Sequence, residues 1–178
     1  PSDLHDRLVA VSHGHPLGLS LLADLVARNG TVPEGTVAAL PPDLVGTLLR
    51  QFVDVVPSEL QRRALEVCAL SRVTTEALLR DVLASDDAHE LFDWLRGLSF
   101  VELGVDGVYP HELARDVLDV DLRWRDPAGY RQTFRAVRAR IHTRLTSTRG
   151  REQQLAIYDE KYLFRNLPSI LAPVDWTA

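Results

Sequence analysis

The pattern of apolar residues changes its period at Phe100, and this change limits what the chain can fold into. Before it, apolar residues recur every three or four positions, as they do on one face of a helix. From Phe100 to Leu103 apolar and polar residues alternate, which is typical of a half-buried strand. Residues 105–107 supply turn chemistry, and Val108 begins a return segment. The sequence therefore predicts one short antiparallel β-hairpin in a chain of helices.

Three predicted helices lead into this hairpin. Ser58 stands three residues before Gln61, which is the spacing of a capping box, and an amphipathic segment follows. A second helix begins after a threonine cap at position 74 or 75 and ends at Leu83. A third helix, capped by the preceding serine, covers residues 86–98. Three helices followed by a hairpin is the order of elements in a winged-helix domain, where the hairpin forms the wing.

The rest of the chain is also predicted to be largely helical, so the expected fold class is mainly α. The further helices are expected at residues 4–12, 16–28, 44 to about 57, 111–120, 127 to about 146 and 152 to about 166. Proline and glycine make residues 31–42 a linker between two of them. We therefore divide the chain into residues 1–42, 43–121 and 122–178, the last being an Arg-rich helical connector.

Composition favours a soluble globular chain inside a cell. Of the 178 residues 46% are hydrophobic and 25% are charged, which is enough to bury a core. No apolar run approaches the roughly 20 residues of a membrane helix, so no membrane partner is expected. Because Cys68 is the one cysteine, an internal disulfide is excluded, which fits the reducing cytoplasm. Cys68 lies among apolar residues and is expected to be buried in the core. Because the chain starts at Pro1 and lacks methionine, we expect it to be part of a longer product.

Charge is distributed unevenly along the chain. Residues 122–151 contain nine arginines and one acid, Asp126, whereas the remainder holds 11 basic and 24 acidic residues, a balance of −13. Within this segment, apolar residues at 130, 134, 137, 141 and 145 fall on one side of a helix and most arginines fall elsewhere. Such a helix either packs its apolar side and pairs its arginines with acids, or meets nucleic acid or another anionic surface.

Motifs for catalysis and for a metal are missing from the sequence. There is no phosphate-binding loop of the G-x-x-x-x-G-K-[ST] type, and no Ser or Cys nucleophile has a plausible base nearby. His13 and His15 have His-X-His spacing, but no third ligand follows at metal-site spacing. We therefore expect no metal and no enzyme activity from this chain. The segment Gly14-His15-Pro16 is either a helix boundary with Pro at its first position or a corner that faces a ligand.

Two segments resemble motifs of one family of ATPases. Gly14-His15-Pro16-Leu17-Gly18-Leu19 is similar to the GLPL motif of STAND-class AAA+ ATPases, the NB-ARC and LuxR-type multidomain regulators. The segment from Tyr109 to Leu118, which contains His111 and the pair Arg115-Asp116, is similar to their MHD motif. Pro110 stands here in place of Met, and Glu112 in place of Asp. The two motifs flank a predicted winged helix, in the order that this family has, and the resemblance covers roughly residues 4–121.

The resemblance implies a role for five residues. Gly14, His15, Pro16 and Leu17 would belong to the end of a helical lid, with Pro16 against the base or ribose of a nucleotide. His111 would reach the β-phosphate of bound ADP and hold the closed state. The bound cofactor would be ATP or ADP in the parent protein, where the main partner is an upstream nucleotide-binding domain. A helical-repeat domain downstream is a second possible partner.

The resemblance thus implies a non-catalytic regulatory segment of a STAND-type signalling or transcriptional regulator. The alternative is a DNA-binding winged-helix regulator that uses its wing and the Arg-rich helix. Against it, residues 85–96 of the third helix contain four acids and one arginine, which is the wrong sign for a DNA groove. Any binding to nucleic acid is therefore expected to be weak, salt-sensitive and non-specific. A protein-interaction domain without a nucleotide is the third possibility.

Overall fold

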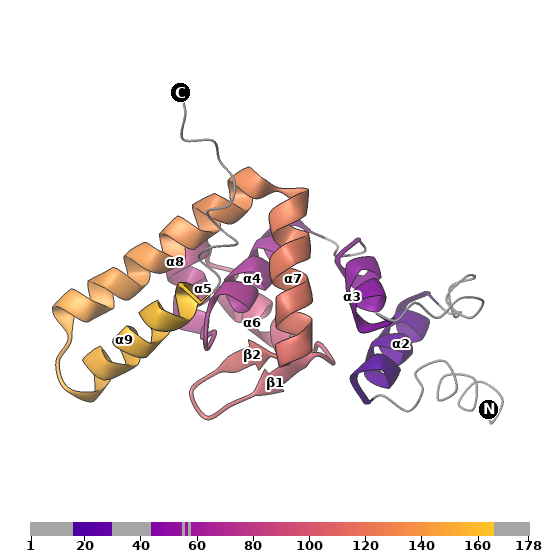
Figure 1. The fold of residues 1–178 in the computed structure, drawn as a ribbon, viewed down its shortest axis with the longest axis horizontal. Helices are drawn as coiled ribbons and strands as arrows, with labels where there is room; N and C mark the ends of the chain where they lie inside the picture. The colour runs from indigo at the N-terminus through magenta and orange to yellow at the C-terminus, as the bar shows by residue number, and fades with distance from the viewer. Residues whose placement is uncertain (1–15, 30–43, 55, 57, 166–178) are drawn as a thin grey trace.

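The computed structural model describes residues 16–29, 44–54, 56 and 58–165, and it is mainly helical with one two-stranded sheet (Figure 1). The fold class expected from the sequence is therefore confirmed. The described elements are, in chain order, α2 (Pro16–Asn29), α3 (Leu44–Asp54), α4 (Glu59–Leu70), α5 (Glu76–Leu83), α6 (Ala88–Arg96), β1 (Val101–Leu103), β2 (Val108–Pro110), α7 (Glu112–Arg125), α8 (Pro127–Ser147) and α9 (Arg151–Leu163). The helix expected at residues 4–12 lies outside the described residues.

The start signals that we identified in the sequence cap three helices. The Ser58 hydroxyl oxygen accepts a hydrogen bond from the Gln61 backbone N–H at 3.1 Å, at the start of α4. At the start of α5, Thr75 rather than Thr74 accepts from Leu78 N–H at 3.1 Å. Asp126 caps α8 by accepting from the backbone N–H groups of Ala128 and Gly129, and Pro127 is the first helical residue.

Several predicted helix boundaries were wrong by a few residues, including both ends of α6, which spans Ala88–Arg96 and not 86–98. α6 begins at Ala88 and not at 86, because the Ser85 hydroxyl accepts from the Asp87 N–H at 3.1 Å and closes a turn before the helix. α7 continues to Arg125, five residues beyond the expected end, since Leu122 is buried in the core. The boundary that we drew between residues 121 and 122 therefore lies within α7. α9 ends at Leu163, before the expected residue 166.

The hairpin predicted from the change of period is confirmed, and a third segment pairs with it. β1 and β2 are antiparallel, with Glu102 opposite Tyr109 in the register. Thr74, from the loop between α4 and α5, exchanges backbone hydrogen bonds of 2.7 and 2.9 Å with Val108. Gly107 lies beside this bridge with φ +149°, and a Cβ there would be 2.4 Å from the Thr74 carbonyl oxygen. The helical part and the wing are thus joined at a point that only glycine fits.

One hydrophobic core connects α2 and α3 to the winged helix. Leu21 and Leu22 of α2 are buried, as are four residues of α3: Leu48, Leu49, Phe52 and Val53. The Phe52 ring meets Phe100 edge to face, with ring centroids 5.1 Å apart. Asp24 of α2 also accepts a hydrogen bond of 3.4 Å from the backbone N–H of Ser99. The two helices therefore pack on the segment that enters the wing.

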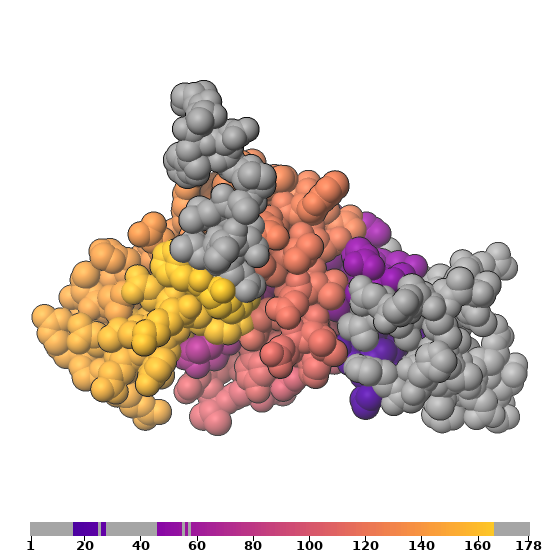
Figure 2. Space-filling view, in the orientation of Figure 1, coloured from indigo at the N-terminus to yellow at the C-terminus, as the bar shows by residue number. Residues whose placement is uncertain are grey.

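The Arg-rich segment packs onto the same body. Tyr130, Val137 and Ile141 of α8 are buried, which confirms the apolar side inferred from the sequence. Figure 2 shows α8 and α9 covering one end of the molecule, with α7 between them and α3. Two hydrogen bonds between buried side chains join α8 to its neighbours: Thr133 donates to Glu66 of α4 at 2.6 Å, and Tyr130 donates to Asp119 of α7. α8 is consequently held by polar contacts as well as by its apolar side.

Candidate functional site

His111 occupies the junction between the wing and α7. Its backbone N–H donates to the Phe100 carbonyl oxygen at 2.8 Å, and its own carbonyl accepts from the Arg115 N–H at 2.9 Å. The ring caps α7, because Nδ1 accepts from the Leu113 N–H at 3.3 Å. With Nδ1 used as an acceptor, the ring proton lies on Nε2, which has no protein partner among the described residues. The side chain is partly exposed, so Nε2 is a donor at the positive end of a helix.

The structure describes two of the four lid residues named from the sequence. Pro16 is exposed at the first position of α2, and Leu17 is buried in the core with 7% of its surface exposed. Gly14 and His15 lie outside the described residues. No hydrogen bond or ring contact of the described residues joins Pro16 to His111. In Figure 1, α2 and α7 begin on the same side of the view, and the bond from Asp24 to Ser99 links α2 to the wing.

A cluster of one aromatic ring and two arginines, which sequence reasoning missed, begins at Arg115, one helical turn after His111. The Tyr162 ring of α9 contacts two guanidinium groups, Arg115 at 4.9 Å and Arg165 at 3.9 Å from the ring centroid. Arg165 also donates to the carbonyls of Ala69 and Tyr162, at 2.9 and 3.0 Å, where α4 and α9 end. The contact of Tyr162 with Arg115 attaches α9 to α7, and that of Arg165 with Ala69 attaches it to α4. Local sequence holds no signal for these two contacts, because the partners are far apart in the chain.

The helix that would read DNA in a winged-helix regulator carries an acidic outer surface. The four acids named from the sequence, at positions 86, 87, 90 and 93, are all exposed. Arg96, the one arginine, is paired with Asp93 at 3.0 Å. The wing adds exposed carboxylates at Glu102 and Asp106 and exposed apolar side chains at Leu103 and Val105. Carboxylates therefore outnumber arginines on this surface, and their net negative charge disfavours a phosphate backbone.

Three of the nine arginines between residues 122 and 151 form ion pairs with carboxylates of the described residues. Arg125 bonds Asp121 and Asp54, Arg140 bonds Asp81 of α5, and Arg144 bonds Asp159 of α9 at 2.8 Å. The guanidinium of Arg138 lies 5.5 Å from the Phe164 ring centroid. These pairs match the first of the two possibilities for this segment, in which its charges serve packing. They compensate the excess of acid in the rest of the chain.

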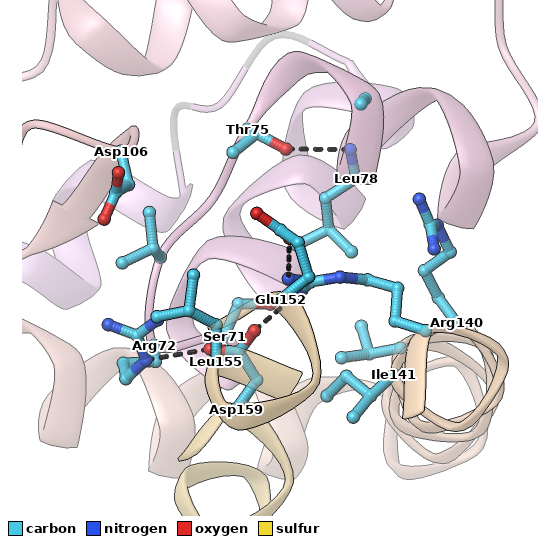
Figure 3. Close-up of a pocket in the computed structure, with 14 residues that line it drawn as sticks. Ser71, Arg72, Thr75, Leu78, Asp106, Arg140, Ile141, Glu152, Leu155 and Asp159 are labelled. Atoms are coloured by element: carbon cyan, nitrogen blue, oxygen red, sulfur yellow. Dashed lines mark hydrogen bonds and ion pairs between the residues drawn. The ribbon is translucent and has the colours of Figure 1, made fainter. Parts of the chain in front are cut away.

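A cavity of about 260 Å³ opens beside α8, and we had not predicted it (Figure 3). Its walls come from the loop between α4 and α5, from α5, α8 and α9, and from the turn of the wing. Three arginines and three carboxylates line it together with aliphatic side chains. These residues are Ser71, Arg72, Val73, Thr75, Ala77, Leu78, Asp106, Val137, Arg140, Ile141, Arg144, Glu152, Leu155 and Asp159. They are spread over about half of the chain, so no local motif predicts the site.

Metal chemistry and thiol chemistry receive no support from the described residues. No group of three or more His, Cys, Asp and Glu side chains in this part of the chain is arranged to hold a metal ion. His13 and His15 lie outside it. Burial raises the pKa of the Cys68 thiol to about 11, so it stays protonated in the core. None of the described helices is long and apolar enough to cross a membrane.

Comparison of the chain with protein-family models, with curated proteins and with solved structures found no match.

Proposed function

We propose that this chain is the non-catalytic regulatory segment of a STAND-type ATP-binding regulator of signalling or transcription. In this proposal it packs on an upstream nucleotide-binding domain and distinguishes ADP from ATP. The observation that carries the proposal is the position of His111, which caps α7 through Nδ1 and keeps Nε2–H available. An imidazole N–H at a helix N-terminus suits a phosphate oxygen, because both the donor and the helix dipole favour negative charge.

The packing of α2 and α3 supports the same proposal. A lid helix can report on a nucleotide only if its position is coupled to the winged helix. The contacts Phe52–Phe100 and Asp24–Ser99 supply such a coupling, and Phe100 in turn bonds His111 through its carbonyl. Exposed Pro16 would contact the base or ribose at the other side of the nucleotide. The histidine and the proline would then close around one ligand only when the upstream domain supplies the remaining contacts.

The proposal assigns separate tasks to the other parts. The ATP chemistry would belong to the upstream domain in the cytoplasm, and α8 with α9 would connect the winged helix to a downstream helical-repeat domain. Sequence-specific DNA binding is less favoured, since the outer surface of α6 and the wing is acidic. Arg131 and Arg135 of α8 are exposed and have no ion pair or hydrogen bond among the described residues, so weak non-specific contact with nucleic acid is compatible with the proposal.

Calorimetry of ADP binding to the full-length parent protein tests the proposal. Replacing His111 with Ala is expected to weaken ADP binding by about ten- to a hundredfold, because a charge-assisted hydrogen bond to phosphate is lost. His89→Ala is the matched control, since His89 is an exposed histidine of α6 far from the start of α7 in the sequence. The isolated chain is expected to bind ADP poorly. Unchanged ADP affinity in the full-length His111→Ala protein would contradict the proposal.

A further inference from the structure

The cavity beside α8 has features of a binding site that the nucleotide proposal does not use. We propose that it binds a small organic anion with a compact apolar body, such as an arylacetate or a branched-chain carboxylate. Its volume of about 260 Å³ suits a molecule of that size. The site is independent of any nucleotide, because its lining residues include neither His111 nor Pro16.

Aliphatic side chains from three helices form the apolar part of the cavity. Leu78 comes from α5, Val137 and Ile141 come from α8, and Leu155 comes from α9. Val137 has none of its surface exposed and Ile141 only 5%, so they support the wall from the core, and the half-buried Leu78 and Leu155 supply most of its accessible apolar surface. An apolar ligand body that covers this wall is removed from water, which supplies affinity without directional contacts.

Two arginines at the cavity have unused hydrogen-bond donors. Arg72 bonds Asp159 through Nε at 2.8 Å, and Arg140 bonds Asp81 through Nε. Neither guanidinium makes a hydrogen bond through its terminal Nη1 and Nη2 groups within the described residues. Each side chain is about one third exposed, and each is held in place by its ion pair. A positioned guanidinium with free terminal N–H groups is the donor arrangement that a carboxylate accepts in a fork.

Ser71 places an unpartnered hydroxyl in the wall of the cavity. Only 6% of this residue is exposed, and its hydroxyl oxygen has no hydrogen-bond partner although it lines the cavity. A buried hydroxyl without a partner costs free energy, so such groups are rare in folded proteins. The oxygen is itself covered by neighbouring atoms, so it would donate to an anion held by the arginines after a change of its χ1 rotamer.

The carboxylates around the cavity affect which charge a bound ligand can carry. Asp159 already accepts from both Arg72 and Arg144 at 2.8 Å, and Glu152 faces Arg144 at 3.6 Å. Asp106, in the turn of the wing, makes no hydrogen bond or ion pair among the described residues, and Figure 3 shows it on the side opposite Arg140. These pairs balance Arg72 and Arg144 against Asp159 and Glu152, as Asp81 balances Arg140, so an anion would be held by the free terminal N–H groups and not by an excess of positive charge. Asp106 at the rim is a like charge that limits affinity for an anion.

Calorimetry of the chain with three matched probes tests the charge of the ligand. We expect saturable binding of phenylacetate, with phenylacetamide weaker by at least about tenfold because it lacks the charge that the arginines recognise. Phenethylamine, the cationic analogue, is expected not to bind. Binding of the amide or the amine that equals or exceeds that of phenylacetate would overturn the proposal. Absence of saturable binding by both phenylacetate and 4-methylpentanoate would also overturn it.

Variants locate the binding and separate it from folding. Arg140→Gln is expected to weaken phenylacetate binding by about tenfold. Arg131→Gln changes the charge of the chain equally, from an exposed position of α8 that does not line the cavity, and should leave binding unchanged. Equal effects of the two substitutions would show that binding depends only on the net charge of the chain, and would refute the proposed site.

Ser71 and Asp106 provide two effects in opposite directions. Ser71→Ala should weaken phenylacetate binding several-fold while the ligand-free protein keeps or gains thermal stability, since the removed hydroxyl has no partner. Asp106→Asn should strengthen phenylacetate binding, because it removes the like charge at the rim. Phenylacetate affinity that does not change in either variant would show that the anion binds elsewhere.

Discussion

α6 and α8 are both amphipathic and highly charged, yet they use their charges in different ways. The ion pairs of α6 involve its own residues or the adjacent α5, as in Asp93 with Arg96, and these side chains are 35–70% exposed. On α8, Arg144 reaches Asp159 of α9, and buried Tyr130 and Thr133 bond carboxylates of α7 and α4. α6 therefore has only exposed polar contacts besides its apolar side, whereas α8 is held by apolar contacts and buried polar contacts together.

This difference explains why two charged amphipathic helices have different roles in the fold. Exposed ion pairs contribute little to stability, so the charges of α6 mainly determine what its outer surface repels. Buried hydrogen-bonded carboxylates cost free energy unless they keep their partners, so the polar residues of α8 specify where the helix sits. The acidic surface of α6 and the fixed position of α8 are the two properties that the following substitutions separate.

Leu95→Ala should have the largest effect, because α6 depends on its apolar side. Leu95 has none of its surface exposed, and a truncated buried leucine costs about 3 kcal/mol of the free energy of unfolding. Leu103→Ala is the control, since this leucine of β1 is 64% exposed and should change stability very little. Urea denaturation measures both variants. A loss below about 1 kcal/mol in Leu95→Ala would show that α6 has other anchors.

Tyr130→Phe tests the polar attachment of α8. Burial, and after it the Asp119 carboxylate, raise the pKa of the Tyr130 hydroxyl far above its usual value, so the group stays a donor. Its removal leaves the buried Asp119 without this bond and should cost about 2 kcal/mol of the free energy of unfolding. Tyr158→Phe, at a position of α9 that is 59% exposed, serves as the control. Equal thermal stability of the two variants would mean that α8 needs no polar anchor.

Glu66→Gln tests the same attachment through pH. Burial raises the pKa of Glu66, and the hydrogen bond from Thr133 offsets this in part. Because the folded state holds the proton more tightly than the unfolded state, the contribution of Glu66 to stability is present at low pH and is lost as pH rises through its pKa in the folded state. A glutamine side chain at this position would remove the pH dependence while accepting the same hydrogen bond. The glutamine variant should therefore be the more stable at pH 7, by about 1 kcal/mol, with the advantage declining on acidification.

Denaturation at several pH values measures this difference between the two proteins. The comparison cancels the titration of all other groups that they share. An advantage of the glutamine variant that grows as pH falls would contradict the assignment of Glu66.

The smallest effects are expected for a matched pair of arginines. Arg144→Gln should cost about 1 kcal/mol, because Asp159 is only 15% exposed and loses one of two partners. Arg96→Gln should cost less than about 0.5 kcal/mol, because both members of its pair with Asp93 are 50% exposed. High salt should weaken the first effect less than the second. A reversed order would break the distinction between α6 and α8.

Local sequence signals were sufficient for the elements of the fold. Ser58, Thr75 and Asp126 cap the helices that follow them, and the alternation after Phe100 forms the hairpin. These features depend on residues within a few positions of one another, so their physics is contained in short segments. The end of α7 was missed for the converse reason, since burial of Leu122 against other helices extends it.

The candidate sites divide in the same way. From the sequence by itself, His111 was named because its segment resembles the MHD motif, and the acidic surface of α6 followed from composition. The cap that His111 Nδ1 forms on Leu113 is local as well, although the sequence did not reveal it. Only the tertiary structure decided that Tyr162 contacts Arg115 as well as Arg165, and that Arg72 and Arg140 border one cavity. The reason is physical: capping and periodicity act over one or two helical turns, whereas ion pairs and cavities form between residues that only the packed chain brings together.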